Sequence, residues 1–106
     1  MSSLAKFAVR TSTYQGSMMV DICDLDIVGA KLEEGELVVN LNKDYYMQQV
    51  LEYSGAGELL KKCDIANLVG DSIVALALEM KMAKELSIKR ISGVPFLMIF
   101  KFRHSG

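Results

Sequence analysis

The chain is poor in the side chains that build most metal and nucleophilic sites. Among its 106 residues it has one histidine, two cysteines, one proline and no tryptophan. His104 stands near the end of the chain and Cys23 is far in sequence from Cys63, so no set of ligands has the spacing of a metal site. We expect neither a metal nor a cofactor, and we expect two buried free thiols rather than a disulfide.

Long apolar runs are also missing. The longest apolar region, residues 65–80, is interrupted by Asn67, Asp71 and Ser72. It falls short of the roughly 20 apolar residues that a membrane-spanning helix needs. The N-terminal residues lack the apolar stretch of a secretory signal. The sequence therefore predicts a cytoplasmic protein with no membrane segment.

The composition is that of a small globular domain. Hydrophobic residues make up 51% of the chain and charged residues 24%, which argues against a disordered chain or a coiled coil. A chain of this length buries roughly two thirds of the surface that its unfolded form exposes, enough for one core. We expect a single domain over residues 1–106, with short frayed ends at 1–5 and 103–106.

Alternating hydrophobicity predicts three strands in the first half of the chain, over residues 7–12, 18–23 and 37–42. The first two are joined by residues 13–17, which contain Gly16 and predict a hairpin with a five-residue connection. Clean alternation implies that one face of each strand meets water. We therefore expect the three strands to be antiparallel neighbours.

The pattern weakens in the middle of the chain. Asp44 predicts the start of a short helix that contains residues 46–53 at helical spacing. The glycines of residues 54–57 should end it, and residues 58–64 predict one or two further helical turns.

A stronger helix follows. Asp71 is its predicted N-cap, and the helix runs from Ser72 to about Leu86. Residues 73–78 leave no polar stripe in its first two turns, which a helix tolerates only when it is covered on nearly all sides. We expect this segment to be the central helix of the core.

The last segment predicts a turn at residues 92–95 between residues 88–91 and a strand over 96–103. That strand is apolar on both faces at first and ends with charge on one face, as in an interior strand that emerges at a sheet edge. The expected fold is α+β: a small mixed, mostly antiparallel sheet of about five strands, packed against a buried central helix and one or two shorter helices.

The turn after residue 66 allows two interpretations. In the structural one, Asn67 bonds buried backbone groups, Gly70 supplies an unusual backbone conformation and Asp71 caps the helix. In the functional one, Asn67 and the helix N-terminus offer a small polar ligand site. We prefer the structural interpretation, also for Gly93 and Pro95, which suit a tight turn.

Charge is distributed unevenly. Residues 1–78 carry six basic and eleven acidic residues, a formal −5, whereas residues 79–106 carry six basic and two acidic, a formal +4. Four cations near two predicted strands can form a basic edge that suits RNA phosphates or an acidic partner, although ordinary solvated strand ends are the simpler explanation for them. These four candidate binding residues are Lys89, Arg90, Lys101 and Arg103.

Two further groups have a functional and a structural interpretation. Tyr45, Tyr46 and Tyr53 can in principle stack on bases, but tyrosines at helical spacing more often pack a helix. The acidic residues between Asp21 and Glu36 lack the ligand spacing of a calcium loop, and a solvated hairpin end is the simpler explanation.

Several motifs, in this order, resemble the archaeal domain of unknown function (DUF) family four-two-four. They are Gly16 before a strand ending at Cys23-Asp24, Gly29-Ala30-Lys31, Glu34-Gly35, Ile65-Ala66-Asn67-Leu68-Val69-Gly70 and Ile91-Ser92-Gly93-Val94-Pro95. Members often place a histidine directly after Gly-Val-Pro, whereas this chain has Phe96, so no role of that histidine carries over. The resemblance implies an archaeal cytosolic single-domain protein and leaves its activity open.

Three functions remain. The preferred one is a non-enzymatic accessory factor that contacts RNA or a ribonucleoprotein through the basic C-terminal edge. The second is an oligomeric or adaptor module in which the acidic and basic parts of different chains meet. The third is a small enzyme that uses Asn67 and Asp71, with Cys63 nearby but no local histidine to activate it.

Overall fold

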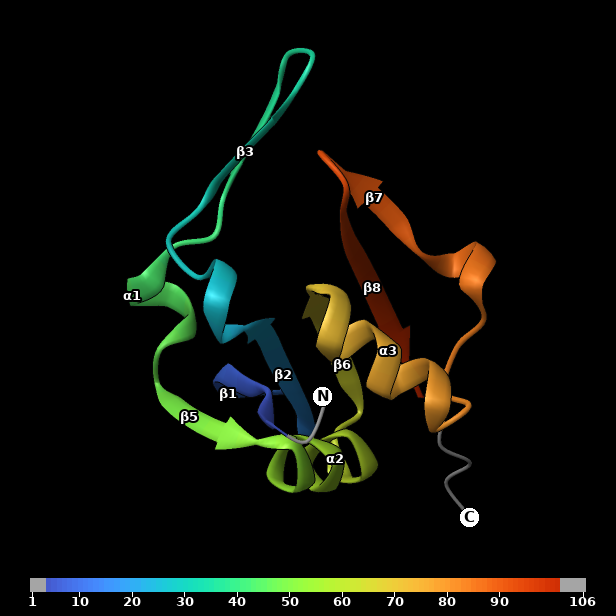
Figure 1. The fold of residues 1–106 in the computed structure, drawn as a ribbon. Coiled ribbons are helices and arrows are strands. Elements are labelled where there is room, and N and C mark those ends of the chain that lie inside the picture. Colours follow the sequence, from blue (N-terminus) through green and yellow to red (C-terminus); the bar gives the residue numbers. More distant parts are fainter. Residues whose placement is uncertain (1–3, 102–106) are drawn as a thin grey trace.

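The computed structural model describes residues 4–101. A six-stranded sheet in the order β5-β1-β2-β6-β8-β7 forms the body, and a separate two-stranded hairpin projects from it (Figure 1). The strands of the large sheet are β1 (Lys6–Tyr14), β2 (Ser17–Asp24), β5 (Gln49–Glu52), β6 (Ile65–Val69), β7 (Lys89–Ile91) and β8 (Val94–Phe100). The hairpin consists of β3 (Lys31–Glu34) and β4 (Leu37–Asn40). The helices are α1 (Lys43–Tyr46), α2 (Tyr53–Lys62) and α3 (Asp71–Glu79), with 3₁₀ turns η2 (Leu25–Ile27) and η3 (Glu85–Ser87).

The expected fold class is confirmed. In the large sheet only β2 and β6 run parallel, and every other neighbouring pair is antiparallel. The connection between β1 and β2 is shorter than predicted, since Tyr14 pairs with Ser17 and only Gln15 and Gly16 lie between them. Both have positive φ, 51° and 80°, as in the type I′ turn whose twist suits two strands.

The main core lies between one face of the large sheet and the helices α2 and α3. Val20 and Ile22 of β2 and Leu68 of β6 point to this side and are fully buried. From α3, the buried side chains are Ile73, Val74, Leu76 and Ala77. The apolar helix therefore covers one face of the sheet, and Ala75 on its outer side is exposed.

Helix α3 is shorter than predicted: it ends at Glu79 rather than near Leu86. Lys81 takes φ +61°, and its N–H donates to the carbonyl of Leu78 while Met82 N–H donates to that of Ala77. This pair of bonds is a Schellman motif, which satisfies the last carbonyls of a helix and turns the chain away.

A second, smaller core lies on the opposite face. Leu32 of β3 and Leu41 pack there with Cys23, Val69 and Ile91 of the large sheet. The prediction that residues 37–42 pair with the first hairpin is wrong, because β4 pairs with β3 and the outer neighbour of β1 is β5. Alternation within a strand shows that one face is buried but not which sheet buries it.

The middle of the chain also differs from the prediction. Helix α1 is a single turn whose cap is Asn42, which accepts the N–H of Asp44 at 2.9 Å, and residues 49–52 then extend as β5. Helix α2 includes the glycines that were expected to end a helix. A Cβ at Gly55 would lie 3.4 Å from Leu51, so a small residue here lets the helix pack closely on β5.

Candidate functional site

On the face of the large sheet opposite α2 and α3, the β3–β4 hairpin packs over the end that carries Cys23, Val69 and Ile91. We call the rest of this face the open face. Its residues form two rows across β1, β2, β6 and β8, as the strand register shows. The first row is Arg10, Asp21, Asn67 and Met98, and the second is Ser12, Met19, Ile65 and Phe100.

A buried carboxylate lies in the first row. Asp21 is 5% exposed, and its Oδ1 accepts Nδ2–H of Asn67 at 3.2 Å while its Oδ2 accepts the hydroxyl of Tyr45 at 3.0 Å. A buried carboxylate is costly unless hydrogen bonds replace its water. The two neutral donors supply such bonds and hold the three side chains in one geometry.

Tyr45 is in turn held from its other sides. The guanidinium carbon of Arg10 lies 4.6 Å from the centre of its ring, a cation–π distance, and the Tyr46 ring lies edge-on at 5.1 Å. Burial raises the pKa of Tyr45, Asp21 raises it further, and Arg10 lowers it. Burial raises the pKa of Tyr46 to about 12. Both phenols are therefore protonated donors at neutral pH.

A groove of about 440 Å³ runs over this cluster. Asp21 and Asn67 contribute to its lining, as do aromatic and apolar side chains of α1 and β8 and one cation of β7. These other residues are Tyr45, Tyr46, Phe96, Met98 and Lys89. The groove thus joins a polar pair, apolar side chains and a positive charge.

The open face also exposes large apolar side chains. Met98 and Phe100 of β8 are each 57% exposed, whereas Leu97 and Ile99 on the other face of the strand are buried. This reverses the expectation from sequence, in which the face that ends in Lys101 was the one to meet water. Exposed apolar groups next to one another on a sheet are typical of a contact surface. Neither residue was predicted as a site residue.

The four basic residues predicted to form one edge are not all together. Lys89 lines the groove, and Arg90 is exposed on the edge strand β7. Lys101 lies beyond the far end of β8, where its Nζ donates to the α2 carbonyls of Leu60 and, at 3.0 Å, of Lys61. Arg103 and His104 fall outside the described residues.

The predicted turn residues are also divided. Asn67 points to the open face with Asp21, whereas Asp71 is exposed at the start of α3, which covers the other face. Within residues 4–101, Cys63 is buried in the main core on the side of α2 and α3, away from the groove that Asn67 lines. The arrangement needed for the small-enzyme hypothesis is therefore not assembled there.

The prediction that Asp71 caps α3 is wrong. The N-cap residue is Gly70, and the carboxylate that serves the helix start is that of Asp24, at the end of β2. It accepts the N–H of Ser72 at 2.8 Å and of Ile73 at 2.9 Å. A local sequence pattern could not identify this cap, because the capping residue lies in another strand.

The expectation that the acidic residues between Asp21 and Glu36 form a solvated hairpin end is wrong for two of them. Asp21 and Asp24 are only 5% and 6% exposed. Burial raises the pKa of Asp24; the two backbone N–H donors lower it, and Asp26 and Asp71 raise it. One feature of the sequence could have identified Asp21 as a buried polar residue. It lies between Met19 and Cys23 on the same face of the strand, where an apolar side chain would be expected if that face is covered.

The other predicted turn lies between β7 and β8. Ser92 and Gly93 form its two-residue loop with φ values of 51° and 82°, and Pro95 is buried in β8. The carbonyl of Pro95 accepts Gly70 N–H at 3.0 Å, and Ser92 N–H donates to Glu34 of the β3–β4 hairpin at 2.8 Å. These contacts are structural: they fix the β7–β8 turn to α3 and to the hairpin.

The two cysteines are buried in different cores on opposite sides of the sheet, and they do not form a disulfide with each other. Burial raises the pKa of Cys23 to about 12, and Asp24 and Asp26 add to the effect, so its thiolate is suppressed. Over residues 4–101, no helix has the length and apolar character required to cross a bilayer.

Comparison with known proteins supports the fold and the family. The crystal structure of an uncharacterized conserved protein from Methanopyrus kandleri is similar over 95% of this chain and 97% of that chain, with a TM-score of 0.75 and 16% sequence identity. That likeness shows the fold alone. No curated protein matches the chain. The model of the family described as protein of unknown function (DUF424) matches residues 12–102, and the chain therefore belongs to this family.

Proposed function

We propose that this protein is a non-enzymatic binding module that takes up single-stranded RNA, free or within a ribonucleoprotein, on its open face. The observation that carries the proposal is the groove over Asp21 and Asn67, where a fixed polar pair lies among aromatic and apolar side chains with a cation at the wall. Single-stranded RNA is bound in proteins by sheet faces that combine stacking surfaces with hydrogen-bonding groups.

Two cations flank the groove residues. Arg10 ends the first row at β1, and Lys89 lies on β7 at the other side of the sheet. This differs from the basic edge expected from sequence, because Lys101 is engaged with α2. Lys89 and Arg90 remain in the proposed contact, with Arg90 at its outer margin.

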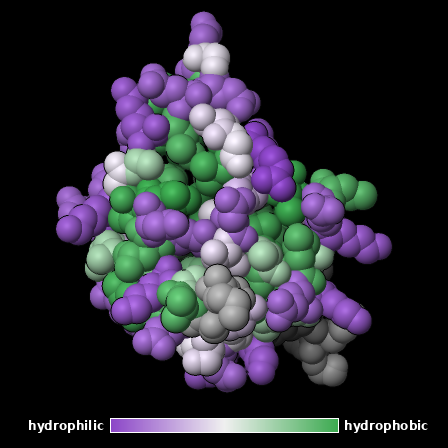
Figure 2. Space-filling view, viewed as in Figure 1, coloured by the Kyte–Doolittle hydropathy of each residue, from purple (hydrophilic) through white to green (hydrophobic). Residues whose placement is uncertain are grey.

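The projecting hairpin limits how an anionic strand can lie. Glu33, Glu34 and Glu36 are exposed there, and Figure 2 shows that the projecting end is hydrophilic. Because these carboxylates repel phosphates, the RNA backbone should pass on the side of Met98 and Phe100, away from the hairpin.

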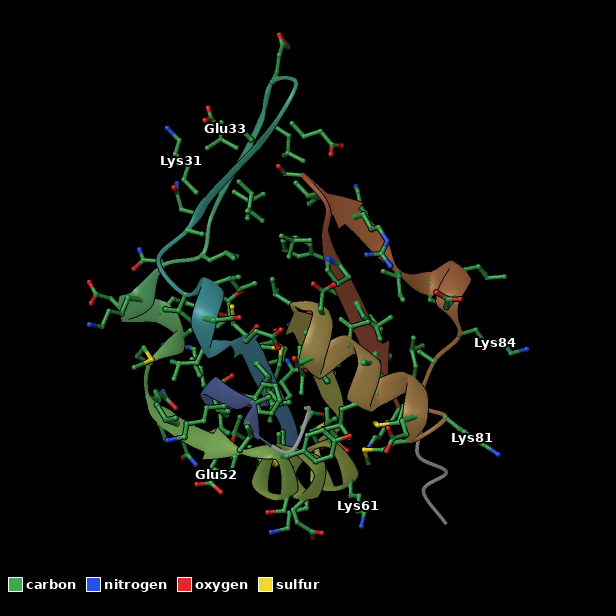
Figure 3. All side chains as sticks on the ribbon, in the orientation of Figure 1. Lys31, Glu33, Glu52, Lys61, Lys81 and Lys84 are labelled. Atoms are coloured by element: carbon green, nitrogen blue, oxygen red, sulfur yellow. The ribbon has the colours of Figure 1, made fainter. Side chains whose placement is uncertain are left out.

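Salt-dependent RNA binding tests the proposal. The double variant Arg10→Gln/Lys89→Gln should weaken binding of a labelled single-stranded RNA and reduce the slope of log affinity against log salt by roughly 1.4, about 0.7 for each lost phosphate contact. The matched control is Lys61→Gln/Lys84→Gln, which removes the same charge from α2 and from the loop after α3; both side chains point outward in Figure 3. Equal slopes for the two variants would refute an open-face contact.

A second candidate function is self-association or adaptor binding to protein. The exposed Met98 and Phe100 favour it, as do the acidic hairpin and the basic stretch from Lys81 to Arg90. Molar mass in solution at low and high salt tests self-association: a mass that falls toward the monomer as salt rises supports it. A monomer under both conditions excludes self-association by charge.

A cytoplasmic location is part of the proposal. The support is that Cys23 and Cys63 lie as thiols in separate cores and cannot stabilise the fold as a pair. Such use of cysteine suits a reducing compartment.

A further inference from the structure

We infer that the outer edge of β8, at Met98 and Phe100, binds an extended peptide that alternates apolar and acidic side chains and joins the large sheet as a further strand. The inference goes beyond the proposed RNA contact and does not depend on it. It gives adaptor binding, the second candidate function, a place on the molecule and a class of partner. Its basis is a row of backbone groups that no strand within residues 4–101 covers.

The backbone groups of Met98 and Phe100 point away from β6. In an antiparallel strand the N–H and C=O of one residue point to the same side, and that side alternates along the strand. Lys101 N–H donates to the carbonyl of Asp64, beside β6, at 2.9 Å, and the carbonyl of Pro95 also accepts a bond from that side. The odd-numbered residues therefore face β6, and the even-numbered residues face outward.

Strand β7 covers only part of this outward row. It pairs with residues 94–96 and stops there, whereas β8 continues to Phe100, as Figure 1 shows. The chain before β7 turns away into η3, where the N–H groups of Ser87 and Ile88 donate to carbonyls of the turn at 2.9 and 3.0 Å. Within residues 4–101, the N–H and C=O groups of Met98 and Phe100 are thus left without a partner strand.

The opposite margin of the sheet shows how such a gap can be closed. There β1 continues past the end of β5, and the N–H of Thr11 donates to Oε1 of Gln48 at 3.0 Å. The gap at β8 is instead flanked by the exposed apolar side chains of Met98 and Phe100. Proteins commonly protect a free edge with charge or proline, and an apolar edge without them is a template for another strand.

The surroundings of the edge specify the side chains of the added strand. Opposite residues of paired strands share a face, so every second residue of the peptide would lie beside Met98 and Phe100, where apolar side chains fit. The residues between them would lie on the other face, towards the loop after α3, which packs on the main core. Residues 80–90 carry four cations and one carboxylate, and Figure 3 shows Lys81 and Lys84 pointing outward. Acidic side chains suit that face.

There is also space beside the edge. A groove of about 580 Å³ lies along the loop after α3 and is lined by apolar residues together with Lys81 and Lys84. Ser87 lines both this groove and the groove over Asp21, so the two hollows meet near the point where β7 ends. Leu86 of η3 is 90% exposed and adds a further apolar contact there.

Hydrogen exchange with a designed probe tests the inference. The probe is a peptide of about six residues, a typical strand length, that alternates valine and glutamate and is blocked at both ends. The amides of Met98 and Phe100 should exchange fast in the free protein, and the peptide should slow them on the order of tenfold. The amides of Leu97 and Ile99 face β6, so they should be slow in both states and serve as the internal control.

Two control peptides separate backbone pairing from charge. A peptide methylated on its valine nitrogens keeps the side chains and charge but loses the donors that face β8, so it should bind on the order of tenfold more weakly. A peptide with lysine in place of glutamate should also bind more weakly, because it meets the cations of the loop. Equal binding of either control peptide would overturn the inference.

Two substitutions at one position give the same test from the protein side. Phe100→Pro removes an outward N–H and leaves the pairing with β6 in place, whereas Phe100→Ala keeps the N–H and removes the ring. The proline variant should lose more affinity for the peptide than the alanine variant. An equal loss in both would refute strand addition.

The unmodified protein covers the case in which Phe100→Pro does not fold. Exchange at Met98 and Phe100 that is already slow without peptide, and slower at higher protein concentration, would identify a second copy of the chain as the occupant and overturn the peptide assignment. Unchanged exchange after peptide addition would also overturn it. RNA binding is measured separately by its salt dependence, so failure of either proposal is distinguishable from failure of the other.

Discussion

Gly70 and Asp24 are in direct contact, and a Cβ built on Gly70 would lie 2.4 Å from Cγ of Asp24. This approach lets the carboxylate at the end of β2 reach the first N–H groups of α3, Ser72 and Ile73. The parallel pairing of β2 with β6 makes this contact possible, because the C-terminal ends of the two strands lie next to each other, where α3 begins. One contact thus connects a strand pairing, a helix start and the main core.

Gly70→Ala should destabilise the fold by about 2–4 kcal/mol. Gly70 has φ +120°, which side chains rarely adopt, and the new methyl would displace the capping carboxylate. Urea unfolding measures the loss. The control is Gly57→Ala in α2, where a Cβ meets nothing within 4 Å, and this variant should gain about 0.5–1 kcal/mol. A loss at Gly70 no larger than the change at Gly57 would contradict the contact.

Asp24→Asn should change how stability depends on pH. The pKa of Asp24 is raised in the folded state, mainly by burial, above the ordinary value of 3.8. A raised carboxyl pKa means that the folded state holds the proton more tightly, so this group's contribution to stability is full below pH 3.8 and is lost as pH rises through the folded-state pKa.

The free energy of unfolding of wild type, measured relative to Asp24→Asn, should therefore fall as pH is raised from about 3 towards 7. Denaturant unfolding at several pH values measures this difference. A difference that grows with pH would show that the two N–H bonds outweigh burial at this site.

The Asp21–Tyr45 hydrogen bond predicts two opposite shifts in one titration. Asp21→Asn should lower the pKa of Tyr45, because the carboxylate raises it through its hydrogen bond and its charge. Arg10→Gln should raise that pKa, since the guanidinium lowers it. NMR of ring-labelled tyrosine follows Tyr45 apart from the other three tyrosines. Shifts of the same sign in both variants would rule out the observed arrangement.

Lys81→Gly should stabilise the protein by about 1 kcal/mol. Lys81 holds the left-handed conformation that ends α3, which costs a side-chain-bearing residue roughly 1–2 kcal/mol, and its side chain points outward (Figure 3). Thermal unfolding measures the gain. Lys84→Gly removes the same charge at a residue with φ −110° and should give no gain. Similar melting temperatures for both variants would argue against the Schellman end.

Lys101→Met should reduce stability by about 1 kcal/mol and leave RNA affinity unchanged. Its ammonium group binds the last carbonyls of α2, so its loss leaves the end of that helix unsatisfied. Urea unfolding and RNA titration measure the two effects. A lower RNA affinity with unchanged stability would contradict this prediction and would show that Lys101 contacts RNA, as the basic edge expected from sequence required.

Much of the fold could be predicted from residues close together in the chain. The alternation in residues 18–23 correctly placed Val20 and Ile22 on one face of a strand, and the apolar stretch after Ser72 correctly indicated a helix against the core. The family resemblance could be read from short motifs such as Ala66 to Gly70 and is confirmed by the family model. These features depend on local periodicity and on the order of the chain.

By itself, then, the sequence determined the α+β class, the apolar faces and the family, because side-chain periodicity and motif order act over a few residues. Only the tertiary structure decided that Asp24 caps the start of α3, that Lys101 binds the last carbonyls of α2, and that Asp21 and Asn67 meet on the open face. Each of these contacts joins residues more than 35 positions apart, and strand order, which short-range patterns do not specify, brings them together.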